Sequence, residues 1–166
     1  ESDLAVDNFE HFSGKASSDL AWGFSSVGAI DFLTGLHEVT EEKTLRGAIA
    51  ERCVRSMQWQ FDECQFDDGA VGMSRRDDKW VGMTAAAILS FTRIRDAGML
   101  TPAQLEVYRP KALLAAEWLL ENLTDTMIDE NGGYVRVTGF SELRPPDNIA
   151  WLFGLTLEAL CVLERI

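Results

Sequence analysis

Apolar residues follow a helical period along most of the chain, and the segment 40–62 shows this most plainly. Its apolar side chains recur every fourth position, at Leu45, Ile49, Cys53, Met57 and Phe61. Residues four apart lie on the same face of an α-helix. The segment is therefore predicted to be an amphipathic helix whose stripe faces the core.

The next two helices are marked by their ends as well. A helix over 80–97 is predicted from the stripe of Met83, Ala87, Phe91 and Ile94, with Gly98 as its stop. Thr101, Pro102 and Gln104 then supply an N-cap, a first-turn proline and a capping box. This pattern continues to about residue 123, and Pro110 predicts a kink or a break in it.

The first and last helical segments are predicted at 20–37 and 147–165. In the first, Val27, Ile30 and either Phe32 or Leu33 face inward. The last is apolar on nearly every side, so we expect it to be packed around most of its circumference. Because strand-like alternation does not persist beyond a few residues, the predicted fold class is all-α.

The helical segments repeat with a period near 60 residues. The stretches 20–36, 78–94 and 148–163 align as first helices, and helices opening at Thr40 and Thr101 align as their partners. Each partner runs into an acidic glycine loop, FDDGAVG or DENGGYVR. Such a period is typical of tandem αα-hairpins, and we place a repeat domain over 20–166 after a weakly patterned segment, 1–19.

The net charge narrows the classes of partner, and the cysteine content bears on disulfide bonds. The net charge is -12, and a field of this sign repels phosphates and anionic lipids, so neither nucleic acid nor a membrane is an expected partner. The three cysteines are too few for a disulfide framework, and Cys53 and Cys161 are predicted to be core residues. No compartment is predicted.

The loops and the helices after them resemble a known superfamily. Hairpins joined by Q-x-D-D-G-A-x-G and N-G-G-Y loops, each followed by a helix opening with Trp and a small residue, resemble the α/α toroids. Terpenoid cyclases and protein prenyltransferase β-subunits belong to that superfamily. The resemblance implies a partial or self-assembled toroid, completed by a second copy or by the remainder of the toroid, because the chain supplies too few hairpins to close one.

Two catalytic signatures of that superfamily do not match. Neither DECQFDD nor RRDDK fits the D-x-D-D motif of squalene and hopene cyclases. Asp62-Glu63-Cys64 matches the D-x-C pair with which prenyltransferases bind zinc, but His11 and His37 both precede it, so a later histidine ligand is missing. No metal and no other cofactor is predicted.

Four loop carboxylates are the candidate catalytic residues: Asp67, Asp68, Asp77 and Asp78. Two of them could act as acid and base on either side of a bond, as in glycoside hydrolysis. The alternative is structural. In it, one of the first pair makes an Asx-turn before Gly69, one of the second pair caps the helix at Trp80, and Arg75 and Arg76 balance their charge.

Candidate ligand-binding residues are aromatic or lie in the longer second loop. Trp22, Trp80 and Trp151 lie near helix starts and could stack on a sugar ring or a hydrophobic ligand, with core packing as the alternative. The second loop adds Tyr134, Arg136 and Arg144, and irregular loops often carry function.

Two functions are predicted. The first is a binding or assembly module with an acidic and aromatic cleft at the glycine-loop end, for a protein partner or a small-molecule or sugar ligand. The alternative is an enzyme that acts on a carbohydrate or isoprenoid-like substrate by carboxylate acid/base chemistry. An enzyme needs two loop carboxylates in one cleft with separated pKa values. In a module the same carboxylates cap helices instead.

Overall fold

The computed structural model describes residues 23–72, 79, 81–122, 126–127, 134–135 and 149–166. These residues form five α-helices: α2 (Gly23–Val39), α3 (Lys43–Glu63), α4 (Val81–Asp96), α5 (Pro102–Asn122) and α6 (Ile149–Val162). A 3₁₀ turn, η1 (Leu163–Arg165), follows α6. Two short strands, β1 (Thr126–Met127) and β2 (Tyr134–Val135), pair antiparallel. The predicted all-α class is confirmed.

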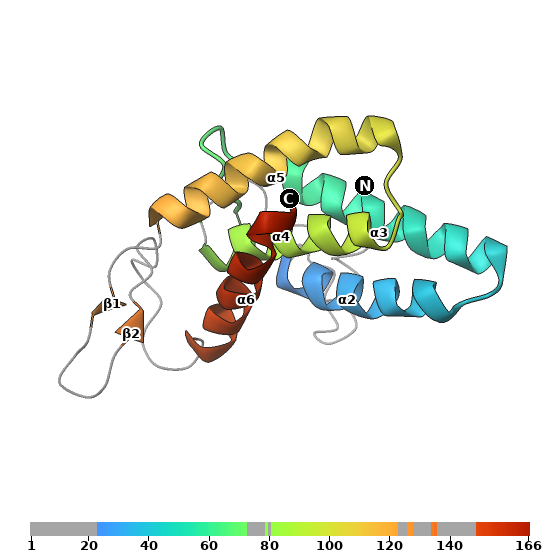
Figure 1. The fold of residues 1–166 in the computed structure, drawn as a ribbon, viewed down its shortest axis with the longest axis horizontal. Coiled ribbons are helices and arrows are strands. Elements are labelled where there is room, and N and C mark those ends of the chain that lie inside the picture. Colours follow the sequence, from blue (N-terminus) through green and yellow to red (C-terminus); the bar gives the residue numbers. More distant parts are fainter. Residues whose placement is uncertain (1–22, 73–78, 80, 123–125, 128–133, 136–148) are drawn as a thin grey trace, which may run out of the picture.

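Helix α4 is the centre of the fold. It packs against α2, α3, α5 and α6, and Figure 1 shows it between α2 and α5, with α6 crossing it. Every residue from Val81 to Thr92 is buried, so the helix buries far more than its predicted stripe. The sequence permits this because the stretch is apolar, small or hydroxylic, and the buried hydroxyl of Ser90 donates to Ala86 O at 2.9 Å.

Aromatic side chains join α4 to α3 and α5. The Phe61 ring of α3 meets Phe91 of α4 edge-on, with centroids 6.5 Å apart, and lies 6.2 Å from the ring of Tyr108 on α5. The predicted stripe of α3 is buried from Ile49 onward. The prediction that Leu45 faces the core is wrong, because its side chain is 43% exposed. Leu45 lies in the first turns of α3, which project beyond α4 in Figure 1.

The ends of α4 and α5 follow the predicted signals. Gly98 has a left-handed φ of +68°, and Met99 N donates to Ile94 O at 3.1 Å, which closes α4. Thr101 N donates to Gln104 Oε1 at 2.9 Å and Gln104 N to Thr101 Oγ1 at 3.2 Å, a complete capping box. The helix opening predicted at Thr40 is displaced, because α3 begins at Lys43.

Pro110 does not break α5, which runs as one helix from Pro102 to Asn122. A proline inside a helix removes one hydrogen bond to the carbonyl four residues earlier, which here belongs to Glu106. Both Pro110 and Glu106 are exposed, so water can satisfy that carbonyl. The proline is tolerated because it lies on the solvent side.

Over residues 154–162, whose side chains are described, helix α6 buries one face only, which contradicts the predicted packing around most of its circumference for this part of the helix. Thr156, Ala159 and Val162 are buried, whereas Leu157 is 46% exposed. Cys161 is also exposed, which corrects its prediction as a core residue. Helix α4 lies on one side of α6, and in the part of the chain that the structure describes no element covers the exposed side.

The inward-facing predictions are confirmed for Cys53 of α3 and for Ile30 of α2. Cys53 is fully buried, and burial raises the pKa of its thiol to about 11. On α2, Ile30 is 1% exposed and Leu33 packs against the core, while Phe32 is 69% exposed. The inward residue is therefore Leu33 and not Phe32. The side chain of Val27 lies outside the described residues.

Ion pairs hold α2 and α6 to the last turn of α4. The guanidinium of Arg93 pairs with Asp31 of α2 at 3.3 Å and with Glu158 of α6 at 2.5 Å. Asp96 pairs with both Arg95 and Arg165. Cations in this position are also favoured by the dipole of α4.

Gln60 provides a test of the core. Its side chain is fully buried, and neither its amide nitrogen nor its amide oxygen has a hydrogen-bond partner among the described residues. We expect Gln60→Met, which keeps the shape but removes the unpaired amide, to raise the free energy of unfolding by about 1–2 kcal/mol. Urea unfolding measures this change.

The matched control for this experiment is Gln104→Met, which removes an amide that the capping box uses. It should lower the free energy of unfolding by about 1 kcal/mol. Destabilisation by Gln60→Met would contradict the prediction, because it would mean that the Gln60 amide has a partner in the folded protein.

Candidate functional site

The first acidic glycine loop is a tight hairpin between α3 and α4. Gln65 and Val71 form an antiparallel bridge across it. Phe66 N donates to Ala70 O at 2.8 Å, and Gly69 N donates back to Phe66 O at 3.0 Å. Gly69 has a φ of +99°. This is the geometry of a short turn closed by a left-handed glycine.

Hydrogen bonds fix this hairpin to α5 and to α4. The buried side chain of Gln65 donates from Nε2 to Lys111 O of α5 at 2.8 Å and to Gly69 O at 3.3 Å. On the other strand, Val71 N donates to Thr84 Oγ1 of α4 at 2.9 Å. The loop is therefore part of the packed scaffold.

Gly69 brings the loop directly onto the backbone of α5. A Cβ atom at this position would lie 2.2 Å from Leu114 O and 2.6 Å from Leu114 C. Both atoms belong to a helix backbone and cannot move aside cheaply. Glycine is therefore required here for the close approach as well as for its φ.

Asp68 is used within the loop. Its Oδ1 accepts a hydrogen bond from Ala70 N at 3.4 Å, as in an Asx-turn, and its Oδ2 pairs with Lys79. Partial burial acts to raise the pKa of Asp68, but the hydrogen bonds from Lys79 and Ala70 outweigh it and lower that pKa. Asp68 therefore makes the Asx-turn of the structural alternative, with Lys79 as its counter-ion, while Arg75 and Arg76 lie outside the described residues.

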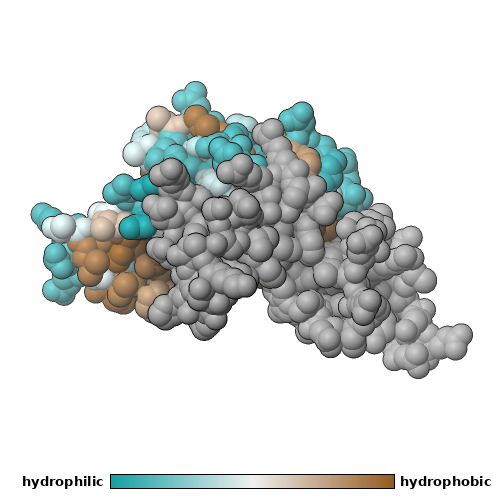
Figure 2. Space-filling model, turned by 180° about the vertical axis from the view of Figure 1, so that it is seen from behind, coloured by the Kyte–Doolittle hydropathy of each residue, from teal (hydrophilic) through white to brown (hydrophobic). Residues whose placement is uncertain are grey.

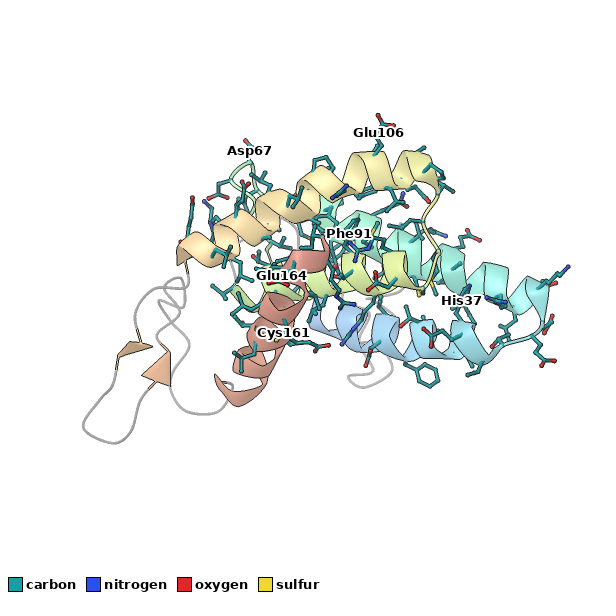
Figure 3. All side chains as sticks on the ribbon, viewed as in Figure 1. His37, Asp67, Phe91, Glu106, Cys161 and Glu164 are labelled. Carbon is teal, nitrogen blue, oxygen red and sulfur yellow. The ribbon has the colours of Figure 1, made fainter. Side chains whose placement is uncertain are left out.

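Asp67, the other carboxylate of the pair, is exposed. Figure 3 shows it at the outer tip of the loop. One carboxylate of the pair is thus bound to a lysine while the other faces solvent.

A second polar cluster attaches the end of α3 to α5. Tyr108 OH donates to Asp62 Oδ2 at 2.7 Å, and Lys111 Nζ lies 2.5 Å from Asp62 Oδ1. Lys111 Nζ is also 5.5 Å from the centroid of the Tyr108 ring. Burial, and then the bond to Asp62, raises the pKa of Tyr108 to about 12.

Asp62 of this cluster is also the first residue of the D-x-C pair. Asp62 faces a tyrosine and a lysine of α5, and Cys64 is buried. Residues 23–72, 79, 81–122 and the other described segments contain no group of three His, Cys, Asp or Glu side chains that could hold a metal ion.

Most of the remaining candidates lie outside the described residues. These are Asp77, Asp78, Trp22, Trp80, Arg136 and Arg144. Tyr134 lies in β2 and Trp151 in the first turn of α6, but their side chains are not described.

Sequence reasoning missed the residues that anchor the loop. Lys79 follows the RRDD stretch directly, so its charge was a usable signal for pairing with a loop carboxylate. Tyr108 and Lys111 carried no such signal, because they lie more than forty residues from Asp62 in the chain.

The chain matches no protein-family model, no curated protein and no solved structure. The resemblance to α/α toroids therefore stays a prediction. Among the described residues, no helix is both long enough and apolar enough to cross a membrane.

Gly69→Ala tests the role of the glycine loop. A side chain here is strained by its φ and clashes with Leu114, so we expect the free energy of unfolding to fall by about 2–4 kcal/mol. Gly98→Ala is the matched control: its φ is also left-handed, but no atom lies within 4 Å of the added carbon. It should cost about 1–2 kcal/mol. Equal losses in chemical unfolding would contradict the close approach.

Tyr108→Phe tests the link between α3 and α5. Because the folded pKa of Tyr108 is raised, its hydrogen bond stabilises the fold below pH 10 and is lost as the pH rises through about 12. The variant should be less stable by about 1 kcal/mol at neutral pH, and this difference should shrink above pH 10.

The same prediction can be followed by absorbance. The chain has two tyrosines, so a titration of tyrosinate absorbance should show a late transition near pH 12 that Tyr108→Phe removes and Tyr134→Phe retains. A late transition that survives in Tyr108→Phe would contradict the assignment.

Proposed function

We propose that this chain is a binding or assembly module on an α/α-toroid-like helical scaffold. Partner helices dock on the faces that α2 and α6 leave exposed. One observation carries the proposal. Helix α4 is buried from Val81 to Thr92, whereas α2 and α6, which both pack against it, each bury one face and expose apolar side chains on the other over the residues whose side chains are described.

The exposed faces have similar composition. On α2 the exposed positions include Gly28, Phe32, Gly35 and Val39. On α6 they include Gly154, Leu157 and Cys161, the last of which is labelled in Figure 3. Phe32 and Val39 are 69% and 75% exposed. Contiguous apolar surface of this kind typically marks an interaction site.

The sequence repeat supports this interpretation. The three stretches that align as first helices are α2, α4 and α6. Helix α4 is the middle one and packs against both others. In an array of stacked hairpins each unit buries its faces against its neighbours, so the outer faces of the first and last helices are the ones left for a partner.

The enzyme alternative is the weaker of the two for the residues described. Its first carboxylate pair is divided between a structural ion pair at Asp68 and a solvent-facing Asp67. The alternative now depends on Asp77, Asp78 and Trp80, which lie outside the described residues.

A direct test measures docking of helices. Amphipathic helical peptides with one apolar stripe are titrated into the ¹⁵N-labelled chain, and self-association is followed by sedimentation equilibrium. We expect saturable binding, of a peptide or of a second copy, with amide shift changes on α2 or α6. Phe32→Glu or Leu157→Glu should weaken binding at the affected face about tenfold or more.

Leu120→Glu on α5 is the control for this test. Leu120 is 55% exposed but lies on neither proposed face, so binding should not change. Circular dichroism checks that each variant stays folded. A chain that remains monomeric and binds no amphipathic helix would contradict the proposed function.

A further inference from the structure

The exposed stripe of α2 is an open apolar surface within the described part of the chain. Gly28, Phe32, Gly35 and Val39 follow the i, i+4, i+7, i+11 spacing of one helix face. We call these four residues the α2 face. Val39 and Phe32 are the two most exposed large hydrophobic residues described. Figure 2 shows hydrophobic surface gathered at this end of the molecule.

The two glycines make the α2 face accessible to a helix backbone. A Cβ atom added at Gly28 or Gly35 would meet no other atom within 4 Å. Phe32 lies between them along the stripe and stands above this low surface as an aromatic anchor. Close approach around one aromatic anchor is typical of sites that bind an amphipathic helix.

Carboxylates lie along one side of the α2 face and beyond its C-terminal end, and we call them the carboxylate rim. Asp31 and Glu38 lie on α2 beside the stripe, and Glu41 and Glu42 follow it in the turn to α3, all of them exposed. Asp31 pairs with Arg93, whereas Glu38, Glu41 and Glu42 have no ion-pair partner among the described residues. Lys43 begins the next helix, so the rim keeps a net negative charge.

We infer that the α2 face binds a basic amphipathic helix. This inference rests on the proposed function and names its partner. The apolar stripe of the partner would cover Phe32 and Val39 while its lysines or arginines meet the carboxylate rim. The net charge of -12 favours approach of such a helix from a distance.

Charge also argues against two other occupants. A second copy that docked its α6 on this face would bring Glu158, which is exposed and shares Arg93 with Asp31, against the carboxylate rim. The segment 1–19 of the same chain carries five acidic residues and one lysine. Both are repelled where a basic helix is attracted.

The test compares two labelled helical peptides that share one apolar stripe, flanked by lysine in one and by glutamate in the other. Fluorescence anisotropy with the full chain should show about tenfold or greater preference for the basic peptide. Phe32→Asp should reduce its affinity about tenfold. Replacing Glu38 and Glu41 with Gln should weaken binding and its salt dependence, and Leu120→Asp should change neither.

Four outcomes would overturn the inference. Equal binding of both peptides would remove the role of the rim. Equal binding of a lysine peptide with a scrambled stripe would show charge attraction alone. Loss of binding in Leu157→Asp but not in Phe32→Asp would place the site on α6 and leave the proposed function standing. Self-association abolished by Phe32→Asp would identify a second copy as the occupant. If no helix and no second copy binds, the proposed function itself fails.

Discussion

The burial of α4 on every side is the constraint on which the rest of this fold depends. A helix with no face for solvent can exist only if neighbours enclose it, and its small residues let α2, α3, α5 and α6 approach closely. Its buried hydroxyls are compatible with this position because they form hydrogen bonds. Ser90 donates to Ala86 O within the helix, and Thr84 accepts a hydrogen bond from the backbone N–H of Val71 in the loop.

The same constraint explains the form of the acidic glycine loop. The chain must leave α3 and reverse its direction where α5 lies against the turn. A left-handed glycine pressed against the backbone of Leu114 makes that path possible. The carboxylate of Asp68 then stabilises the turn. A sequence that suggests catalysis in isolation is thus accounted for, at this residue, by chain geometry.

Features that depend on nearby residues could be predicted from the sequence, and features that depend on distant ones could not. The capping box at Thr101 and the stop at Gly98 are local, as is the buried stripe from Ile49 to Phe61, and all appear as expected. The exposure of Leu45 and Leu157 depends on which elements lie opposite them. The hydrogen bond between Asp62 and Tyr108 joins α3 to α5 across 46 residues of sequence, a separation that no local pattern can predict.

Arg93 gives the two edge helices a shared electrostatic link. One guanidinium is divided between Asp31 beside the α2 face and Glu158 on α6. A cation that arrives at Asp31 competes with Arg93, which is then left with Glu158 as its main counter-ion. A basic partner bound beside Asp31 would therefore change the charge balance around Glu158 on α6 through this one side chain.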